Sequence, residues 1–391
     1  MDISLYFEPV DVGNIIDETR SHPNHLHHSL LIYKKANAFP AIDGIDIAIL
    51  GVKESRMAVG NSGCNDAPDQ VRRYLYSLFK HNNNIKIADL GNVIPGNVIG
   101  DTYFALRDIV ASLLGKNIIP FIIGGSQDLT YANYLAYESL GRIINLVCVD
   151  MEFDLGEIGN QVNSKTYLSK IITHQPSYLF NYSNIGYQTY FVDREAVELM
   201  DKLFFDVYRL GLVQTDIEEV EPMVRNADLL SVDLSAVRQS DAPGNAGATP
   251  NGFYGEELCR IMRYAGMSDK LTSAGLYEIN PEYDRKGQTA GLAAQAIWYF
   301  IDGFYNRKQD FPIRDKKFYI KYRVAIKELQ NEIIFYKSKK TNRWWMEVPC
   351  PSRLKSKYER HYLVPCSYND YRTAMKEEIP DRWWQAYQKI M

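Results

Sequence analysis

The chain has 391 residues, 46% of them hydrophobic, which is enough to bury one large core, or one core and a small appendage. The N-terminal stretch has no basic segment followed by an apolar one. No run of about 18 apolar residues occurs either, so we expect neither secretion nor a membrane span. The five cysteines are scattered without a CxxC pair, which is typical of a reducing compartment. These features predict a folded cytoplasmic protein.

The net charge of −4 is unevenly distributed along the chain. Residues 307–391 carry 20 Lys and Arg against 10 Asp and Glu, whereas residues 1–306 carry 24 against 38. The basic segment also holds four of the five tryptophans. We therefore predict two parts, an α/β domain at 1–306 and a basic, Trp-rich C-terminal extension at 307–391.

Apolar runs of strand length recur through the first part, and many are separated by segments whose apolar residues recur at helical spacing. Because the runs are apolar at consecutive positions, they are typical of strands buried on both faces of a parallel sheet. The pattern predicts an α/β fold with a mostly parallel, doubly wound sheet. The expected strands are 46–52, 117–123, 143–149, 229–234 and 271–277, and the expected helices include 101–114 and 255–265.

Polar residues follow four of these strands at the point where each strand ends. In a doubly wound sheet the carboxyl ends of the strands meet at one rim, where ligands bind. Several buried carboxylates at one rim require a cation, an arginine or water to offset their charge. The residues predicted at this rim are Gln127, Asp150, Glu152, Asp154, Asp233, Ser235 and Glu278.

These motifs resemble, in order and spacing, the arginase or ureohydrolase family, which includes agmatinase and formimidoylglutamase. GGSQD from Gly124 is similar to the family's GGDHS, and DMEFD from Asp150 is similar to DAHxD. SVDLSAVRQSDAPG from Ser231 is similar to SFDxDxxDP, and EINP from Glu278 matches Glu-x-Asn-Pro. The resemblance covers about residues 45–303 and is strongest to formimidoylglutamase-like members. It implies a three-layer, arginase-like fold for this part and a small α+β extension after it.

Family members hold two manganese ions with four aspartates and two histidines, and the ions generate the attacking hydroxide. Mapped onto this chain, the resemblance leaves Asp150, Asp154 and Asp233 unchanged at ligand positions. The other three ligand positions differ, because Gln127 and Glu152 replace the two histidines and Ser235 replaces an aspartate. An oxygen-rich set of ligands favours hard cations such as Mg²⁺ or Ca²⁺. Because the neutral Ser235 is a poor substitute for a carboxylate that anchors a second ion, we expect at most one divalent cation, Mg²⁺, Ca²⁺ or Mn²⁺.

The absence of any cofactor is the alternative that we favour. Arg238 stands three residues after Ser235, and its guanidinium could turn toward the carboxylates as a built-in cation. Either outcome weakens hydrolysis, because hydroxide is scarce at neutral pH without a metal-bound water. Glu278 matches the family residue that receives a guanidinium, which implies contact with a guanidine or amidine, although a carboxylate bonded only to loop amides is the alternative.

The C-terminal extension has strand-forming runs at 317–326 and 332–336 and a predicted helix from about Tyr368. One interpretation of Trp344, Trp345, Trp383 and Trp384 is that they pack the extension onto the first part, helped by opposite charges. The other is that they form a basic, aromatic surface for a partner. We favour docking or a protein partner over nucleic acid, since no nucleic-acid-binding motif is present.

The sequence thus leads to two hypotheses about function. The first is a ureohydrolase-fold protein whose metal site has degenerated and which acts as a binding or assembly component through its extension. The second is a formimidoylglutamase-like hydrolase of a linear amidine with an altered, oxygen-rich metal site. Relatives of this kind commonly form trimers or hexamers, but the extension could block or create such contacts, so the sequence leaves open whether the chain forms a homo-oligomer.

Overall fold

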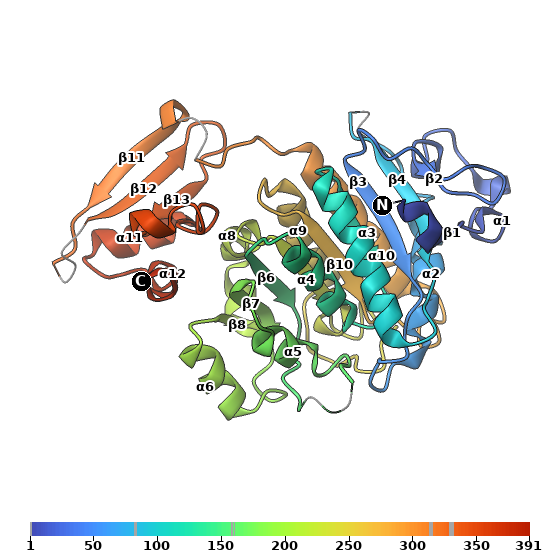
Figure 1. The fold of residues 1–391 in the computed structure, drawn as a ribbon, viewed down its shortest axis with the longest axis horizontal. Coiled ribbons are helices and arrows are strands. Elements are labelled where there is room, and N and C mark those ends of the chain that lie inside the picture. The colour runs from blue at the N-terminus through green and yellow to red at the C-terminus, as the bar shows by residue number, and fades with distance from the viewer. Residues whose placement is uncertain (1, 82–83, 158, 160, 313–315, 328–331) are drawn as a thin grey trace.

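A ten-stranded, mostly parallel sheet forms the centre of the molecule in a computed structural model, which describes residues 2–81, 84–157, 159, 161–312, 316–327 and 332–391. The strand order is β1-β4-β3-β5-β10-β9-β6-β7-β8, with β2 beside β4, and only β1 runs antiparallel to its neighbour. The predicted α/β class is therefore confirmed (Figure 1). The strands are β1 (Phe7–Glu8), β2 (Leu31–Ile32), β3 (Ile47–Val52), β4 (Ile87–Val93), β5 (Ile119–Ile123), β6 (Ile144–Val149), β7 (Leu179–Tyr187), β8 (Asp206–Arg209), β9 (Leu229–Asp233) and β10 (Ser273–Tyr277).

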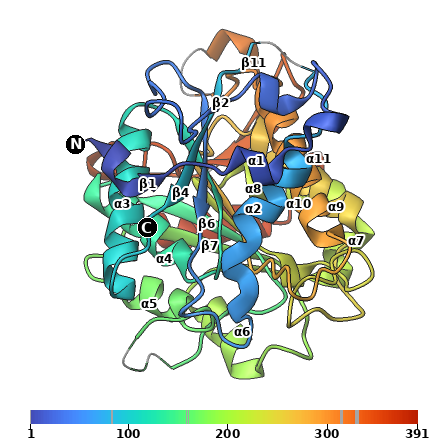
Figure 2. The same ribbon diagram turned by 90° about the vertical axis from the view of Figure 1, so that its right-hand side faces the viewer.

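Helices cover both faces of this sheet, as Figure 2 shows with the sheet nearly edge-on. Every residue of β3, β5, β6, β9 and β10 is buried, because both faces of these strands pack against a helical layer. One hydrophobic core lies under α2 (Ala67–Leu75), α7 (Leu210–Thr215), α8 (Val220–Arg225), α9 (Gly255–Met267) and α10 (Gln288–Tyr305). The other lies under α3 (Ile99–Gly115), α4 (Leu129–Ser139), α5 (Tyr167–Thr173) and α6 (Arg194–Lys202).

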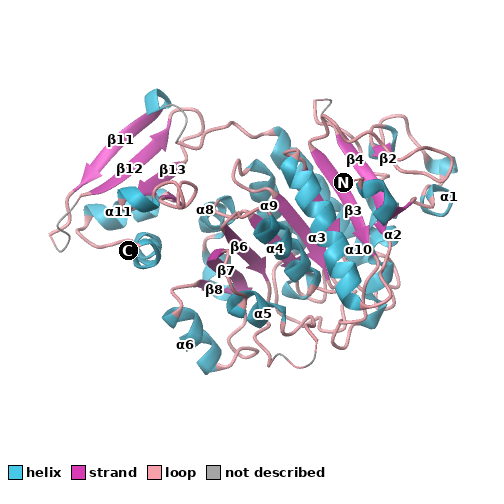
Figure 3. Ribbon diagram, in the orientation of Figure 1, coloured by secondary structure: helices cyan, strands magenta, loops and turns pink. Residues whose placement is uncertain are grey.

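A second, four-stranded antiparallel sheet follows the first part of the chain (Figure 3). Its order is β11-β12-β13-β14, and its strands are β11 (Tyr319–Val324), β12 (Ile333–Ser338), β13 (Trp344–Glu347) and β14 (Leu363–Cys366). Two helices, α11 (Tyr368–Met375) and α12 (Asp381–Ile390), complete it. This sheet has hydrophobic clusters of its own. The exact division of the chain at residue 306 stays a prediction.

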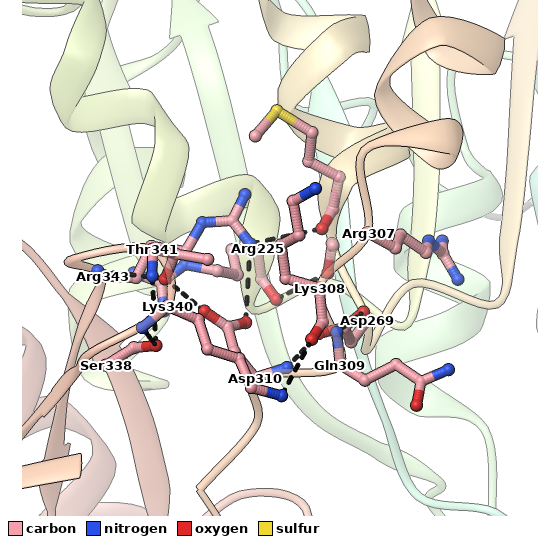
Figure 4. A network of polar contacts seen from close by, with 12 residues as sticks. Arg225, Asp269, Arg307, Lys308, Gln309, Asp310, Ser338, Lys340, Thr341 and Arg343 are labelled. Atoms are coloured by element: carbon pink, nitrogen blue, oxygen red, sulfur yellow. Dashed lines mark hydrogen bonds and ion pairs between the residues drawn. The ribbon is translucent and has the colours of Figure 1, made fainter. Parts of the chain in front are cut away.

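Arginines hold the extension against the body of the molecule. Arg225 of α8 is buried and donates to the carbonyls of Trp344 and Cys366 at 3.2 Å, while its guanidinium lies 4.4 Å from the centre of a Trp345 ring. Arg343 of the extension pairs with Glu221 of α8 at 3.1 Å. Figure 4 shows the adjoining polar network. The positive side chains at this contact face carboxylates and carbonyls. Their charge-assisted hydrogen bonds offset the free-energy cost of removing each cation from water.

Among the described residues, no helix is long and apolar enough to cross a membrane.

Candidate functional site

Four neighbouring strands bring the predicted rim residues together. The strands β5, β10, β9 and β6 lie side by side and parallel, so the residues after them share one edge of the sheet. Gln127 follows β5, Glu278 follows β10, and Asp150 follows β6. Asp233 is the last residue of β9. The sequence motifs that suggested a common rim are thus explained by parallel strand pairing.

Three buried aspartates form the centre of this site. Burial raises the pKa of Asp150 well above its usual range, and the nearby charges of Asp154 and Asp233 raise it further. Burial also raises the pKa of Asp154, to about 6, and that of Asp233. One buried oxygen of Asp150 and one of Asp154 have no partner among the described residues. Such a cluster of carboxylates is unfavourable without a cation.

Lys165 supplies a positive charge to this cluster. Its ammonium lies 3.2 Å from Asp154 and 3.5 Å from Glu152. Burial alone would lower the pKa of Lys165, but the carboxylates, led by Asp154, raise it above the usual value. Lys165 therefore stays charged. Lys165 lies eleven residues after Asp154 in the loop that leads to α5, outside every motif that marked the rim in the sequence.

Arg238, the cation expected from the sequence, does not turn toward the cluster. Its Nε pairs with Asp241 at 3.0 Å, and its guanidinium lies 3.8 Å from the centre of the Tyr254 ring. Stacking on an aromatic face and pairing with a nearby acid hold the side chain there. The expectation for Arg238 as a built-in cation is wrong, and Lys165 occupies that role.

The three altered ligand positions lie at the same edge. Gln127 directs its Nε2 toward the Ser231 hydroxyl at 3.4 Å, while its side-chain oxygen has no described partner. The backbone N–H of Ser235 donates to Asp233 at 2.6 Å, and the buried Ser235 hydroxyl is likewise unpartnered among the described residues. Glu152 is partly exposed at the mouth of the site. The structure places these residues near the aspartates, but whether they bind a ligand stays a prediction.

Glu278 is held by amides from several loops. Its carboxylate accepts from the backbone N–H of Gln127 at 2.8 Å and from the Asn61 side chain at 2.7 Å. The side chain of Asn245 donates to its backbone carbonyl. Burial raises the pKa of Glu278 to about 8, and Asp233 adds to the effect. Its backbone has a positive φ of 63°, a conformation that is strained for a residue other than glycine. Neither Asn61 nor Asn245 was predicted, because isolated asparagines carry no motif.

The tryptophans of the extension are mostly internal. Trp344, Trp345 and Trp383 are buried, and Trp344 stacks on Tyr371 with ring centres 5.0 Å apart. Trp384 is 43% exposed. Three of the four thus lie where a partner cannot touch them directly, and their part in partner binding remains untested.

Solved structures share this fold. Formiminoglutamase from Trypanosoma cruzi, solved with Mn2+2, aligns with a TM-score of 0.64 at 19% identity over 69% of this chain and 97% of that one. Formimidoylglutamase from Bacillus subtilis aligns with a TM-score of 0.66 at 18% identity over 76% of this chain and 98% of that one. The manganese in the first structure corrects one expectation. We expected no cofactor, or at most one divalent cation, whereas manganese is the metal that this fold family implies for the site.

The residues of this chain differ from the family's ligand set. Carboxylate and amide oxygens suit manganese, but the neutral Ser235 stands where the family has an aspartate, so one anionic ligand of a two-metal site is lost. The Lys165 ammonium also competes with a bound cation for Asp154. Among the described residues, no group of three or more His, Cys, Asp or Glu side chains is arranged so that it could hold a metal ion. The donor set therefore does not fit the manganese site of the relatives, and we derive no chemical step through that metal.

The sequence comparisons agree with the fold. Formimidoylglutamase from Lysinibacillus sphaericus is 24% identical over 299 residues, which cover 72% of this chain and 92% of that protein. Formimidoylglutamase from Photorhabdus laumondii is 24% identical over 267 residues, or 65% of this chain and 83% of that one. The model of the arginase family matches residues 45–302. On this match, and on the order of strands and rim motifs that accompanies it, the chain belongs to the arginase family.

Proposed function

We propose that this protein is an arginase-family member that does not hydrolyse amidines or guanidines and that works as a binding or assembly component. The observation that carries the proposal is that the Lys165 ammonium lies 3.2 Å from Asp154. Asp154 stands at a position where the family's chemistry needs a carboxylate that binds metal, and here this carboxylate faces a lysine. Hydrolysis in this family depends on metal-activated water. The described residues at the rim include no histidine that could replace it as a general base.

A second function is favoured by a different observation. Asp150, Asp154, Asp233 and Glu278 all remain at the positions of the family motifs, and the relatives named above are formimidoylglutamases. The Glu278 carboxylate would contact the amidinium group of a linear amidine, as the resemblance implies. Hydrolysis of formimidoylglutamate or a similar amidine is therefore the competing proposal.

One assay separates the two proposals. The full-length protein is incubated with saturating Mn²⁺ and with formimidoylglutamate, agmatine or arginine, and the release of ammonia, formamide and urea is measured. The first proposal expects no release above the protein-free control for any of these compounds. Turnover of formimidoylglutamate that depends on added Mn²⁺ establishes the second proposal and ends the first.

Binding through the extension is the other half of the first proposal. Its exposed apolar side chains include Tyr368, Met375 and Trp384, which could contact a second protein or another copy of this chain. Size-exclusion chromatography with light scattering, followed by affinity capture with wild-type and Trp384→Ala protein, tests this half. Two results together would contradict this half of the proposal. The wild-type protein would be monomeric, and the Trp384→Ala protein would capture every protein that the wild type captures.

A further inference from the structure

A cavity lies at the opposite edge of the central sheet from the carboxylate cluster. It has a volume of about 570 Å³ and is lined at the amino ends of the strands by Asp46 before β3, Ile119 of β5 and Thr272 before β10. Gln309 and Phe311, which follow α10, and Arg360 of the extension close its other side. The cavity is therefore shared by the body and the extension, and its size is in the range of small-molecule sites.

Cations outnumber carboxylates around this cavity. Four basic side chains line it, against two acids. Both acids are already engaged by backbone groups, since Asp46 accepts from the N–H of Lys86, and Asp269 accepts from the N–H groups of Gln309 and Asp310. The basic residues are Arg142, Lys270, Arg307 and Arg360.

Two of these cations share a single carboxylate. Arg360 pairs with Asp228 at 2.7 Å, and the Lys270 ammonium lies 3.6 Å from the same side chain. Burial lowers the pKa of Lys270 to about 8, although Asp228 opposes this change. Lys270 is buried whereas the Arg360 side chain is 49% exposed. One carboxylate carries a single negative charge against these two cations, so this part of the cavity wall attracts negative charge.

The other two cations form no ion pair with a described carboxylate, although Asp269 is near enough to Arg307 to act on its charge. The exposed Arg142 side chain makes no hydrogen bond or ion pair with any other residue that the structure describes. Arg307 donates its Nε and Nη2 to the carbonyls of Gly266 and Leu271, at 2.8 and 3.1 Å, and lies over the Phe304 ring. Figure 4 shows Arg307 and Gln309 directed away from the network around Asp310. Hydrogen bonds to carbonyls thus occupy two nitrogens of the Arg307 guanidinium. The Arg142 guanidinium has no such bond among the described residues.

Apolar side chains form the remaining wall. Phe304 and Phe311 contribute aromatic rings, and Leu114, Ile118 and Leu271 contribute aliphatic surface. A bare inorganic anion would leave this surface in contact with water. A ligand that joins an anionic group to an apolar ring would cover the apolar wall and neutralise the cations together.

We propose that this cavity binds a small organic anion, a phosphate or carboxylate attached to an apolar ring, at the junction of the body and the extension. The site is separate from the rim cluster, and the inference does not depend on whether that cluster is catalytic. Because the body and the extension both contribute lining residues, the ligand stabilises their contact when it binds.

Calorimetric titration of the full-length protein tests the proposal. The probes are phenyl phosphate and benzoate, with inorganic phosphate and benzyl alcohol as the anion-only and ring-only controls. We expect one site per chain for phenyl phosphate or benzoate, and binding at least tenfold weaker for both controls. The tighter of the two anions identifies the oxyanion. Failure of both ring-bearing anions to bind, or equal binding of either control, overturns the proposal.

Variants place the binding at this cavity. Arg142→Gln removes an exposed guanidinium without a described partner, so the fold is retained, and we expect about tenfold weaker binding, since a charge-assisted hydrogen bond contributes about that factor. Arg307→Gln should weaken binding further. Arg194→Gln is the matched control, because Arg194 is 90% exposed on α6 and pairs with Glu198. Unchanged affinity in Arg142→Gln and Arg307→Gln, with both variants folded by circular dichroism, overturns the assignment.

Discussion

Replacement of Lys165 by methionine removes the cation next to the buried aspartates and keeps a side chain of similar length. At the observed 3.2 Å separation, Coulomb's law with an effective dielectric constant of about 20 gives an attraction of about 5 kcal/mol for Lys165 and Asp154. The Lys165 side chain is 37% exposed, so water screens the pair, and the ammonium also regains hydration on unfolding. We therefore expect Lys165→Met to lower the free energy of unfolding by about 2 kcal/mol near neutral pH.

The loss should depend on pH in a defined direction. Burial already raises the pKa of Asp154 to about 6, and loss of Lys165 raises it further. A carboxylate with a raised pKa binds a proton more readily in the folded state, so its protonation stabilises the folded protein as the pH falls from above 6 toward 4. The difference in unfolding free energy between Lys165→Met and wild type should accordingly be largest above neutral pH and shrink toward pH 5.

Urea-induced unfolding followed by tryptophan fluorescence measures this difference at several pH values, with and without added Mn²⁺. Lys170→Met is the matched control, since Lys170 lies in α5 close to Lys165 and pairs with no described carboxylate. A loss of the same size at pH 5 and at neutral pH, or no loss at all, would refute the electrostatic role that we give to Lys165.

Three further predictions concern residues outside the carboxylate cluster. Arg225→Met should lower the free energy of unfolding by about 3 kcal/mol, because it leaves two buried carbonyls unpaired, whereas the exposed Arg194→Met should change it little. Burial lowers the pKa of His361 to about 3, so the contribution of this residue to the free energy of unfolding should fall by about 2 kcal/mol between neutral pH and pH 5, and His361→Asn should lack that part of the pH dependence of wild type. Gly125→Ala should be strongly destabilising in thermal unfolding, since a Cβ there would lie 1.8 Å from the Glu54 carbonyl.

The strands that the sequence predicted are those with apolar residues at consecutive positions. The runs at 46–52, 117–123 and 143–149 correspond to β3, β5 and β6 within two residues at each end. The strand β7 was missed, because Asn181, Ser183 and Asn184 interrupt its apolar pattern. Polar partners, such as Asp206 of β8 for Asn181, satisfy these side chains in the folded protein. Such pairing depends on tertiary contacts that a local pattern does not contain.

The site was predicted where ordered motifs mark it and missed where single residues complete it. Asp150, Asp154 and Asp233 come together because the carboxyl ends of adjacent strands meet. Lys165 reaches them from a loop, and the position of a loop is set by packing. The prediction for Arg238 failed because sequence distance from Ser235 does not reveal that Tyr254 and Asp241 hold it elsewhere.

We expect the altered rim residues, together with Lys165, to prevent amidine hydrolysis. The rate of formimidoylglutamate hydrolysis at saturating Mn²⁺ tests this expectation when wild type is compared with a variant that carries Gln127→His, Glu152→His, Ser235→Asp and Lys165→Met. Wild type should show no turnover, whereas the variant should bind Mn²⁺ at least tenfold more tightly and show measurable turnover. Measurable turnover by wild type, at or above the rate of the variant, would overturn this expectation.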